Sequence, residues 1–571
     1  MDTVSERTET GAPAAPSPSS GQAPRTGLTL SNYTLLVAAG AFATTFAQSR
    51  LVANYPTLFL LKDQLHLTRG AVAVFFFWAT FAWNIKPLAG ILTDAFPLLG
   101  TRRRSYMIVG SAVAALFWLL MSVSNGSYAL LLLASIGMNV ANVFASTVMG
   151  GLMVEAGQAF GAPGRISALR QYTMSIAGIG APLLGGWLAS KAFERTVGWR
   201  LTTWIGAATM ATLAVLTVLC LKEQRKARES RPRAALVPAG RLAAPPGAFM
   251  GLGLALIPAI YLTINPVTRT IGYSVFALLA VFALLLALIS MPTANPVVVN
   301  AQSQLVQILR SRTLWLAVVM LFLVYTVPGL GTALSYRQED VLKFPKTLIG
   351  SLDSLSGIFG VLAAGAYVLF CRRFSLRVFL PVILVMNAAA TLLYLDDTRG
   401  TAPFIHALGG LLGILNELAI MDLAVRSTPA GCEGLGFALM MSVRNFGLAM
   451  SDVLGTKMMD QAHISWNNMV IINASTTLLA VVFTVFLPKV IVSGKDEPGG
   501  ADLITGVLLA SAAGLLAGGA IAALIEHSLH SSIPPFALLS SPVTVIGAMI
   551  GLLIVPGVWR FSGRFNAAQR A

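Results

Sequence analysis

Long apolar segments, separated by short polar or basic stretches, fill most of the 571-residue chain. A helix of about 20 apolar residues is long enough to cross a bilayer, and sixteen segments of the chain are candidates for such spans. The pattern therefore predicts an all-α polytopic membrane protein.

Stretches without long apolar runs divide these spans into groups. Residues 1–30 are rich in Ser, Pro, Ala, Thr and Gly, a composition typical of a disordered tail. Residues 223–246 form a basic, proline-containing loop, and residues 293–312 form a polar linker. We therefore expect, in chain order, a six-helix bundle at 31–222, an extra helical hairpin at 247–292, a second six-helix bundle at 313–494, and a C-terminal hairpin with a tail at 495–571.

An internal repeat supports two homologous bundles. Residues 155–188 align with residues 422–455 at a constant offset of 267, so that Glu155 falls on Asp422. In each copy an acidic residue ends one helix, a loop with Pro and Gly follows, and the next helix is rich in small residues. Parallel six-helix repeats are the construction of major facilitator transporters, whose substrates bind between the halves near the bilayer midplane.

Composition and charge narrow the class of protein further. The chain is 56% hydrophobic and only 11% charged, whereas soluble domains carry about 25% charged residues. The net charge of +16 is explained by Lys and Arg in cytoplasmic loops rather than by nucleic-acid binding. No phosphate-binding loop, metal-ligand spacing or disulfide framework is visible, so we expect neither a cofactor nor a metal.

Basic loops also predict the orientation. Clusters of Lys and Arg lie at 98–105, 222–246, 371–377 and 560–570. All four fall on one side of the membrane if each span crosses it, so both termini are expected in the cytoplasm. A short tail without targeting features favours the bacterial inner membrane.

The end of the second span carries a candidate gate. Gly90 and Asp94 precede a basic turn that contains Arg102 and Arg103, a pattern that resembles the helix 2–3 loop of the major facilitator superfamily. A carboxylate beside arginines at a helix end can form a latch that breaks and reforms as the bundles move. The alternative is simple anchoring of the loop by its positive charge.

A narrower resemblance covers both bundles. The segments concerned are Tyr55-Pro-Thr-Leu-Phe-Leu-Leu-Lys-Asp, then Trp83-Asn-Ile-Lys-Pro-Leu-Ala-Gly, and Pro429-Ala-Gly-Cys-Glu-Gly-Leu-Gly-Phe-Ala-Leu-Met-Met-Ser-Val-Arg-Asn. In this order they resemble the folate–biopterin transporter family. The resemblance implies a proton-coupled or exchange carrier for folates or related pteridines.

Polar residues inside the spans are candidate substrate ligands, because buried charge is costly in a membrane. Cations suit the carboxylates of a folate-like anion, and amide or acid groups suit the edge of its pterin ring. The candidates are Gln48, Arg50, Lys86, Glu417, Arg444 and Asn445. The alternative is that the three cations pair with Asp452, Glu417 or Asp94 and hold the helices together.

A second set of residues is predicted to carry proton coupling or gating. Glu155, Glu417 and Asp452 are candidates for an acid that must be neutralised before the loaded carrier reorients. Arg170, Asp422 and Glu433, with Glu155, lie at predicted cytoplasmic helix ends and are interpreted as gate ion pairs.

We therefore expect a secondary active transporter that moves folate or a related pteridine by alternating access, with protons and the lipid bilayer as its other partners. A major facilitator carrier for another organic anion or a drug would share the architecture. A membrane-embedded enzyme would need an acidic or His/Asp cluster at one interface, and the sequence contains none.

Overall fold

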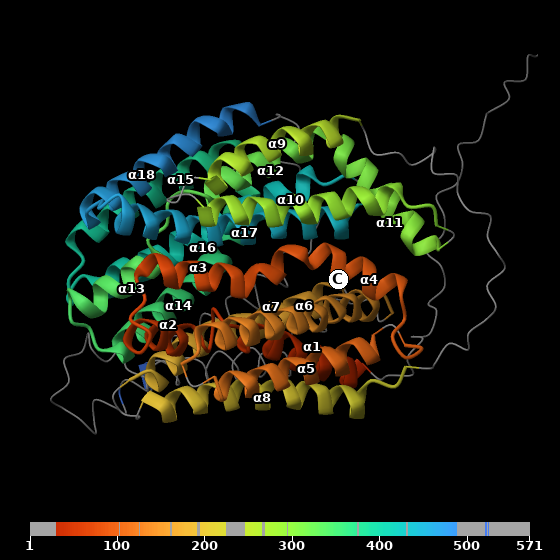
Figure 1. Cartoon of the computed structure of the whole chain (residues 1–571), viewed down its shortest axis with the longest axis horizontal. Coiled ribbons are helices and arrows are strands. Elements are labelled where there is room, and N and C mark those ends of the chain that lie inside the picture. Colours follow the sequence, from red (N-terminus) through yellow and green to blue (C-terminus); the bar gives the residue numbers. More distant parts are fainter. Residues whose placement is uncertain are drawn as a thin grey trace, which may run out of the picture.

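The computed structural model is helical throughout the part of the chain that it describes (Figure 1). The described residues are 30–101, 103–124, 126–159, 163–190, 195–223, 246–264, 269–293, 295–373, 376–429, 432–487, 520–521 and 524. Almost all of the predicted N-terminal tail and C-terminal hairpin lies outside these ranges.

In the N-terminal half, helices cover the six segments predicted as spans, and the first two segments are each divided into shorter helices. These elements are α1 (Leu30–Phe46), α2 (Asn54–Asp63), α3 (Arg69–Thr80), the 3₁₀ helix η1 (Phe81–Ile85), α4 (Lys86–Ala95), α5 (Arg104–Ser122), α6 (Tyr128–Ala159), α7 (Pro163–Leu188) and α8 (Arg195–Cys220).

The extra hairpin and the C-terminal half follow. Their elements are α9 (Pro246–Ile264), α10 (Arg269–Ser290), α11 (Pro296–Arg310), α12 (Arg312–Tyr325), α13 (Gly331–Asp340), α14 (Lys346–Arg373), α15 (Leu376–Leu392), η3 (Leu393–Asp396), α16 (Ala402–Ser427), α17 (Glu433–Gln461), α18 (Trp466–Phe483) and η4 (Thr484–Phe486). Within the described residues, nine helical segments are long and apolar enough to cross a membrane, or ten if the bent pair α11–α12 counts as one span.

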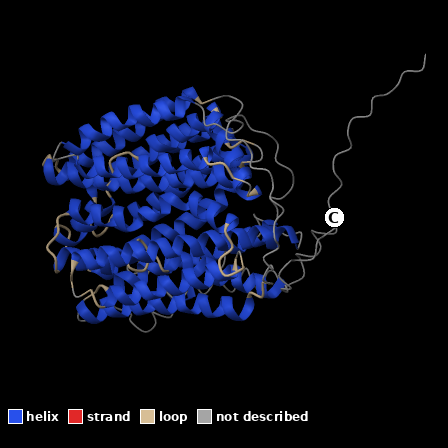
Figure 2. Cartoon of the chain, turned by 45° about the vertical axis from the view of Figure 1, so that its right-hand side comes forward, coloured by secondary structure: helices blue, strands red, loops and turns tan. Residues whose placement is uncertain are grey.

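The helices form two layers that run in roughly the same direction (Figures 1 and 2). Helices of the N-terminal half make the lower layer of Figure 1, around a core that includes Trp118 and Phe75. The extra hairpin and most helices of the C-terminal half make the upper layer, around a core that includes Leu380 and Ile420. Apolar side chains also pack between the halves, since Ile349 and Leu352 of α14 belong to the first of these cores.

The two halves touch most closely where α7 packs against α14. A Cβ atom added at Gly350 of α14 would lie 2.5 Å from the carbonyl oxygen of Pro182, and one at Gly186 would lie 2.9 Å from the Cα atom of Gly350. The Ser354 hydroxyl donates to the Ile179 carbonyl across the same contact, at 2.8 Å. Glycine here permits a backbone approach that a side chain would prevent.

The stretch predicted as a polar linker at 293–312 forms helix α11, which bends by 75° from α12. The helix is amphipathic: Asn300, Ser303, Gln307 and Arg310 are exposed at helical spacing, while the opposite face is buried. Asn295 begins the helix, since its side chain accepts a hydrogen bond from the Val297 amide. The segment resembles a polar linker in the sequence because most residues on the exposed face of this helix are uncharged and polar.

Candidate substrate and coupling site

The first predicted span is interrupted at 47–53, and Arg50 lies in this break instead of in the middle of a helix, as the sequence led us to expect. The amide of Asn142 on α6 donates to the carbonyls of Thr44 and Ala47, at 3.1 and 3.2 Å. These bonds satisfy backbone acceptors that the end of α1 leaves free. The break therefore depends on a neighbouring helix.

A matching break at 326–330 divides the first span of the C-terminal bundle. Pro328 and Gly329 interrupt the helix locally. The Gly329 amide donates to the Ser451 carbonyl of α17 at 2.8 Å, and the Asn473 amide of α18 donates to the Pro328 carbonyl at 2.7 Å. A Cβ atom at Gly455 would lie 1.8 Å from the Gly329 carbonyl oxygen, so α17 approaches the break directly.

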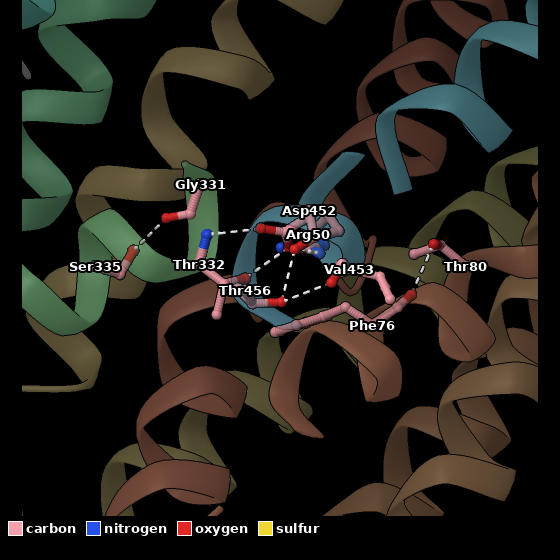
Figure 3. Close-up of polar contacts among 9 residues, drawn as sticks. All are labelled: Arg50, Phe76, Thr80, Gly331, Thr332, Ser335, Asp452, Val453 and Thr456. Carbon is pink, nitrogen blue, oxygen red and sulfur yellow. Dashed lines mark hydrogen bonds and ion pairs between the residues drawn. The ribbon is translucent and has the colours of Figure 1, made fainter. Parts of the chain in front are cut away.

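An ion pair joins the first break to α17, next to the helix that follows the second break (Figure 3). Nη2 of Arg50 lies 2.7 Å from Oδ2 of Asp452, and the guanidinium lies 4.1 Å from the ring centre of Phe76. The Asp452 carboxylate also accepts hydrogen bonds from the Thr332 amide at 2.8 Å and the Thr332 hydroxyl at 2.6 Å. Thr332 is in the first turn of α13, where the helix dipole favours a negative charge. One cation and one helix N-terminus thus hold the buried carboxylate.

A second ion pair lies within the C-terminal half. Nη2 of Arg444 on α17 is 2.5 Å from Oε2 of Glu417 on α16. Nη1 of Arg444 donates to Oδ1 of Asn445 at 3.2 Å, and the guanidinium lies 5.4 Å from the ring centre of Tyr325. Two of the three cations predicted to bind substrate therefore have carboxylate partners, as the alternative interpretation expects.

Lys86 differs from these two arginines. Its ammonium donates to the Ser146 hydroxyl at 3.2 Å and lies 5.3 Å from the ring centre of Trp83. Arg170 of α7 is near enough to repel its charge. Among the side chains that the structure describes, no carboxylate forms an ion pair with either cation. Lys86 and Arg170 therefore form a positively charged region on the N-terminal bundle.

The polar residues predicted to bind substrate near these cations already make hydrogen bonds within the protein. The Gln48 amide, in the first break, donates to the Thr44 carbonyl near the end of α1, at 2.7 Å. Asn445 uses its side-chain oxygen to accept from Arg444, as described above. Asn139 connects the first break to Lys86: it donates to the Ser49 hydroxyl at 2.8 Å and accepts from the Trp83 indole at 3.0 Å. The sequence did not suggest Asn139, because it has no charge.

The predicted gate residues are only partly described. Asp422 pairs with Arg426 on its own helix, through two contacts of 2.8 Å. The Arg103 guanidinium lies against α6, where a Cβ atom at Gly151 would be 2.5 Å from its Cζ atom. Arg102 and the side chains of Asp94, Glu155 and Glu433 lie outside the described part of the chain.

A cluster of ion pairs connects the two halves at the end of the molecule opposite to the predicted gate residues. Lys346 pairs with Asp63 of the N-terminal half at 2.6 Å and with Glu339 of its own half at 3.3 Å. Lys62 contacts Glu339 and, at 2.5 Å, Asp340. We call this end, which also holds the 2.7 Å pair of Arg69 and Asp460, the ion-pair end. The sequence showed mixed charges in these loops but gave no sign of which residues pair.

Comparisons with known proteins identify the family. The sequence model of the BT1 family matches residues 49–502, which is most of the chain. The chain belongs to this family. "Probable folate-biopterin transporter 4" of Arabidopsis thaliana is 24% identical over 464 residues, which are 75% of this chain and 90% of that protein. The folate-biopterin transporter of Synechocystis is 24% identical over 463 residues, 77% of this chain and 79% of the relative.

Solved structures establish the fold of this BT1 family member. The POT family transporter PepTSo superposes with a TM-score of 0.56 at 14% identity, covering 82% of this chain and 98% of its own. A D-xylose–proton symporter gives a TM-score of 0.53 at 12% identity, and the match covers 81% of this chain and 98% of the symporter. The chain is therefore a multi-pass membrane transporter of the major facilitator fold and not an enzyme, and its family implies a small-molecule substrate.

Proposed function

We propose that this transporter moves folate or a related pteridine anion across the membrane by alternating access, coupled to protons. Two relatives that each match about three quarters of the chain are named folate-biopterin transporters, which supports the substrate class. The two-bundle fold supports alternating access, in which the halves rock around a site between them.

The observation that carries the proposal is the ion pair between Arg50 and Asp452. It connects Arg50, in the broken first span of the N-terminal half, to Asp452 of α17, which also holds Thr332 just after the break in the C-terminal half. Movement of one half against the other must stretch or break this pair. Protonation of Asp452 removes its charge, weakens its hold on Arg50, and thereby links a proton to the movement.

Lys86 is the cation that we assign to the substrate anion. Its ammonium has a hydroxyl and an indole ring as neighbours, so a carboxylate would add charge compensation without displacing an existing described ion pair. Arg170 would add positive potential. Of the groups predicted to meet the pterin ring, Gln48 and Asn445 would contact it, while Glu417 would remain paired with Arg444.

The proposed orientation follows the basic loops. Both termini would lie in the cytoplasm of a bacterial cell, and the ion-pair end would face away from it. We keep the predicted division into two six-helix bundles with extra hairpins at 247–292 and 495–571.

Uptake of labelled folate and biopterin into proteoliposomes, with and without an imposed proton gradient, tests the proposal. We expect accumulation driven by the gradient. The Asp452→Asn variant should lose this response but retain exchange of internal for external substrate. Asp396→Asn, which alters an exposed carboxylate, is the matched control. Gradient-driven uptake by Asp452→Asn would refute the coupling role, and no transport of either compound by folded protein would refute the substrate class.

A further inference from the structure

A groove lined only by apolar side chains lies where the extra hairpin meets both bundles. It is narrow and partly open to the surroundings, so that a chain lying along it would remain in contact with what surrounds the protein. Its walls include Pro87 of α4, Leu285 of α10, Leu309 of α11, Trp315 of α12 and Leu435 of α17. No function described above uses this groove.

Two arginines stand at the bend between α11 and α12, next to the groove in the chain. Arg310 directly follows Leu309 at the end of α11. Arg312 lies one helical turn before Trp315, so Arg312 and Trp315 share one face of α12. Both arginines are exposed, and neither forms an ion pair or hydrogen bond within the described part of the chain. The Trp315 indole donates to the Leu309 carbonyl at 3.2 Å, which fixes the bend beside them.

Helix α11 packs its apolar face against the protein and leaves a polar face exposed. The buried face lies on α10 and on Ile91 of α4, and Asn300 and Gln307 are on the exposed face. The 75° bend turns the chain from this surface helix into the span α12. The arginines at the bend would then lie at the level of lipid headgroups, with Trp315 at the membrane interface.

We infer that this groove binds an acyl chain of an anionic phospholipid whose phosphate is held by Arg310 and Arg312. The apolar lining suits a hydrocarbon chain and offers nothing to a polar solute. The two free guanidinium groups supply charge complementary to a phosphate, which arginine can bind through paired hydrogen bonds.

Such a lipid would touch both halves of the transporter. Pro87 belongs to the N-terminal half and Leu435 to the C-terminal half, while Leu285 and Leu309 belong to the segment between them. Bound lipid would therefore stabilise the arrangement of the halves in which these surfaces are adjacent.

Thermal unfolding of the purified protein in detergent, with phosphatidylglycerol or phosphatidylcholine added, tests the inference. We expect phosphatidylglycerol to raise Tm more than phosphatidylcholine does. In the Arg310→Gln/Arg312→Gln variant, the concentration of phosphatidylglycerol needed for half of this shift should rise on the order of tenfold. Arg399→Gln, which alters an exposed arginine between η3 and α16, should behave as wild type.

A second variant tests the acyl-chain part. Leu309→Trp should fill the groove and weaken the phosphatidylglycerol effect while both arginines remain. Glycerol phosphate, which has the anionic group without acyl chains, should not reproduce the shift. Equal stabilisation by both lipids, an undiminished effect in the double arginine variant, or an equal effect of glycerol phosphate would each overturn the inference.

Discussion

At the scale of single residues, the interior cations are of two kinds: those paired with a described carboxylate and those without such a pair. Arg50 and Arg444 have carboxylate partners at 2.7 and 2.5 Å, whereas Lys86 contacts a hydroxyl and an aromatic ring. Removing one member of a buried pair leaves an uncompensated charge, whereas removing a cation that lacks a partner relieves a desolvation cost. The two kinds of cation should respond differently to neutralisation.

We predict that Lys86→Gln abolishes or strongly reduces substrate uptake without lowering Tm. Arg444→Gln should lower Tm, because Glu417 then lacks its cation. Differential scanning fluorimetry and uptake on the same preparations measure both effects. The double variant Glu417→Gln/Arg444→Gln should recover much of the lost Tm. A fall in Tm for Lys86→Gln as large as that for Arg444→Gln would show that Lys86 has a structural role.

Asp397 gives a prediction about pH at the ion-pair end. Burial raises the pKa of this carboxyl group to about 6, against the opposing effect of Arg337. In the unfolded chain an aspartate carboxyl group has a pKa of about 3.9. The folded state therefore binds the proton of Asp397 more tightly than the unfolded state does. Stability should therefore fall as the pH rises from about 4 to about 6 and stay reduced above that range.

Asp397→Asn should raise Tm at pH 7.5 and flatten the dependence of Tm on pH between 4 and 6. The matched control is Asp396→Asn, since Asp396 is exposed and adjacent in the chain. An unchanged pH profile in Asp397→Asn, measured by thermal unfolding, would contradict the assignment.

At the scale of elements, the sequence predicted the spans better than their interruptions. Pro328 and Gly329 are a local signal for the break between α12 and α13. The break between α1 and α2 lacks such a pair, and its carbonyl groups are satisfied by Asn142 from α6. Contacts with a residue so distant in sequence cannot be read from local patterns. Arg50 was therefore placed in a helix and not in a break.

We predict that Asn139→Leu lowers Tm, because this fully buried amide of α6 makes three hydrogen bonds, with Trp83, Ser49 and the Ser135 carbonyl. Its loss leaves the Trp83 indole without its acceptor, and an unsatisfied buried donor costs about 1–3 kcal/mol. Uptake should fall as well, since Trp83 lies beside Lys86. Asn467→Leu, at an exposed position, should change neither property. Wild-type Tm in Asn139→Leu would show that the network does not stabilise the break.

At the scale of the whole molecule, periodicity and the repeat predicted two six-helix bundles, and the fold has this architecture. The sequence also placed mixed charges in the loops of the ion-pair end. It could not pair Lys346 with Asp63, because that contact joins residues 283 positions apart in different halves. The ion pairs that hold the two halves together could therefore be identified only from the structure.

The glycine contact between α7 and α14 should control whether the ion-pair end can close. A Cβ atom at Gly350 would lie 2.5 Å from the Pro182 carbonyl, a backbone atom that cannot move aside without moving α7. Gly350→Ala should therefore separate the halves at this end and strain the ion pairs beyond it. Gly178→Ala on α7 is the control, because no atom lies within 4 Å of its Cβ position.

Spin labels at Gln64 and Lys343, both exposed at the ion-pair end, can measure this separation by pulsed electron paramagnetic resonance. We expect Gly350→Ala to shift the distance distribution to longer values and Gly178→Ala to leave it unchanged. High salt should lengthen the wild-type distance less than Gly350→Ala does, because partly buried ion pairs are weakly screened. An unchanged distribution in folded Gly350→Ala would mean that close backbone packing is not required for closure, and that the ion pairs alone maintain it.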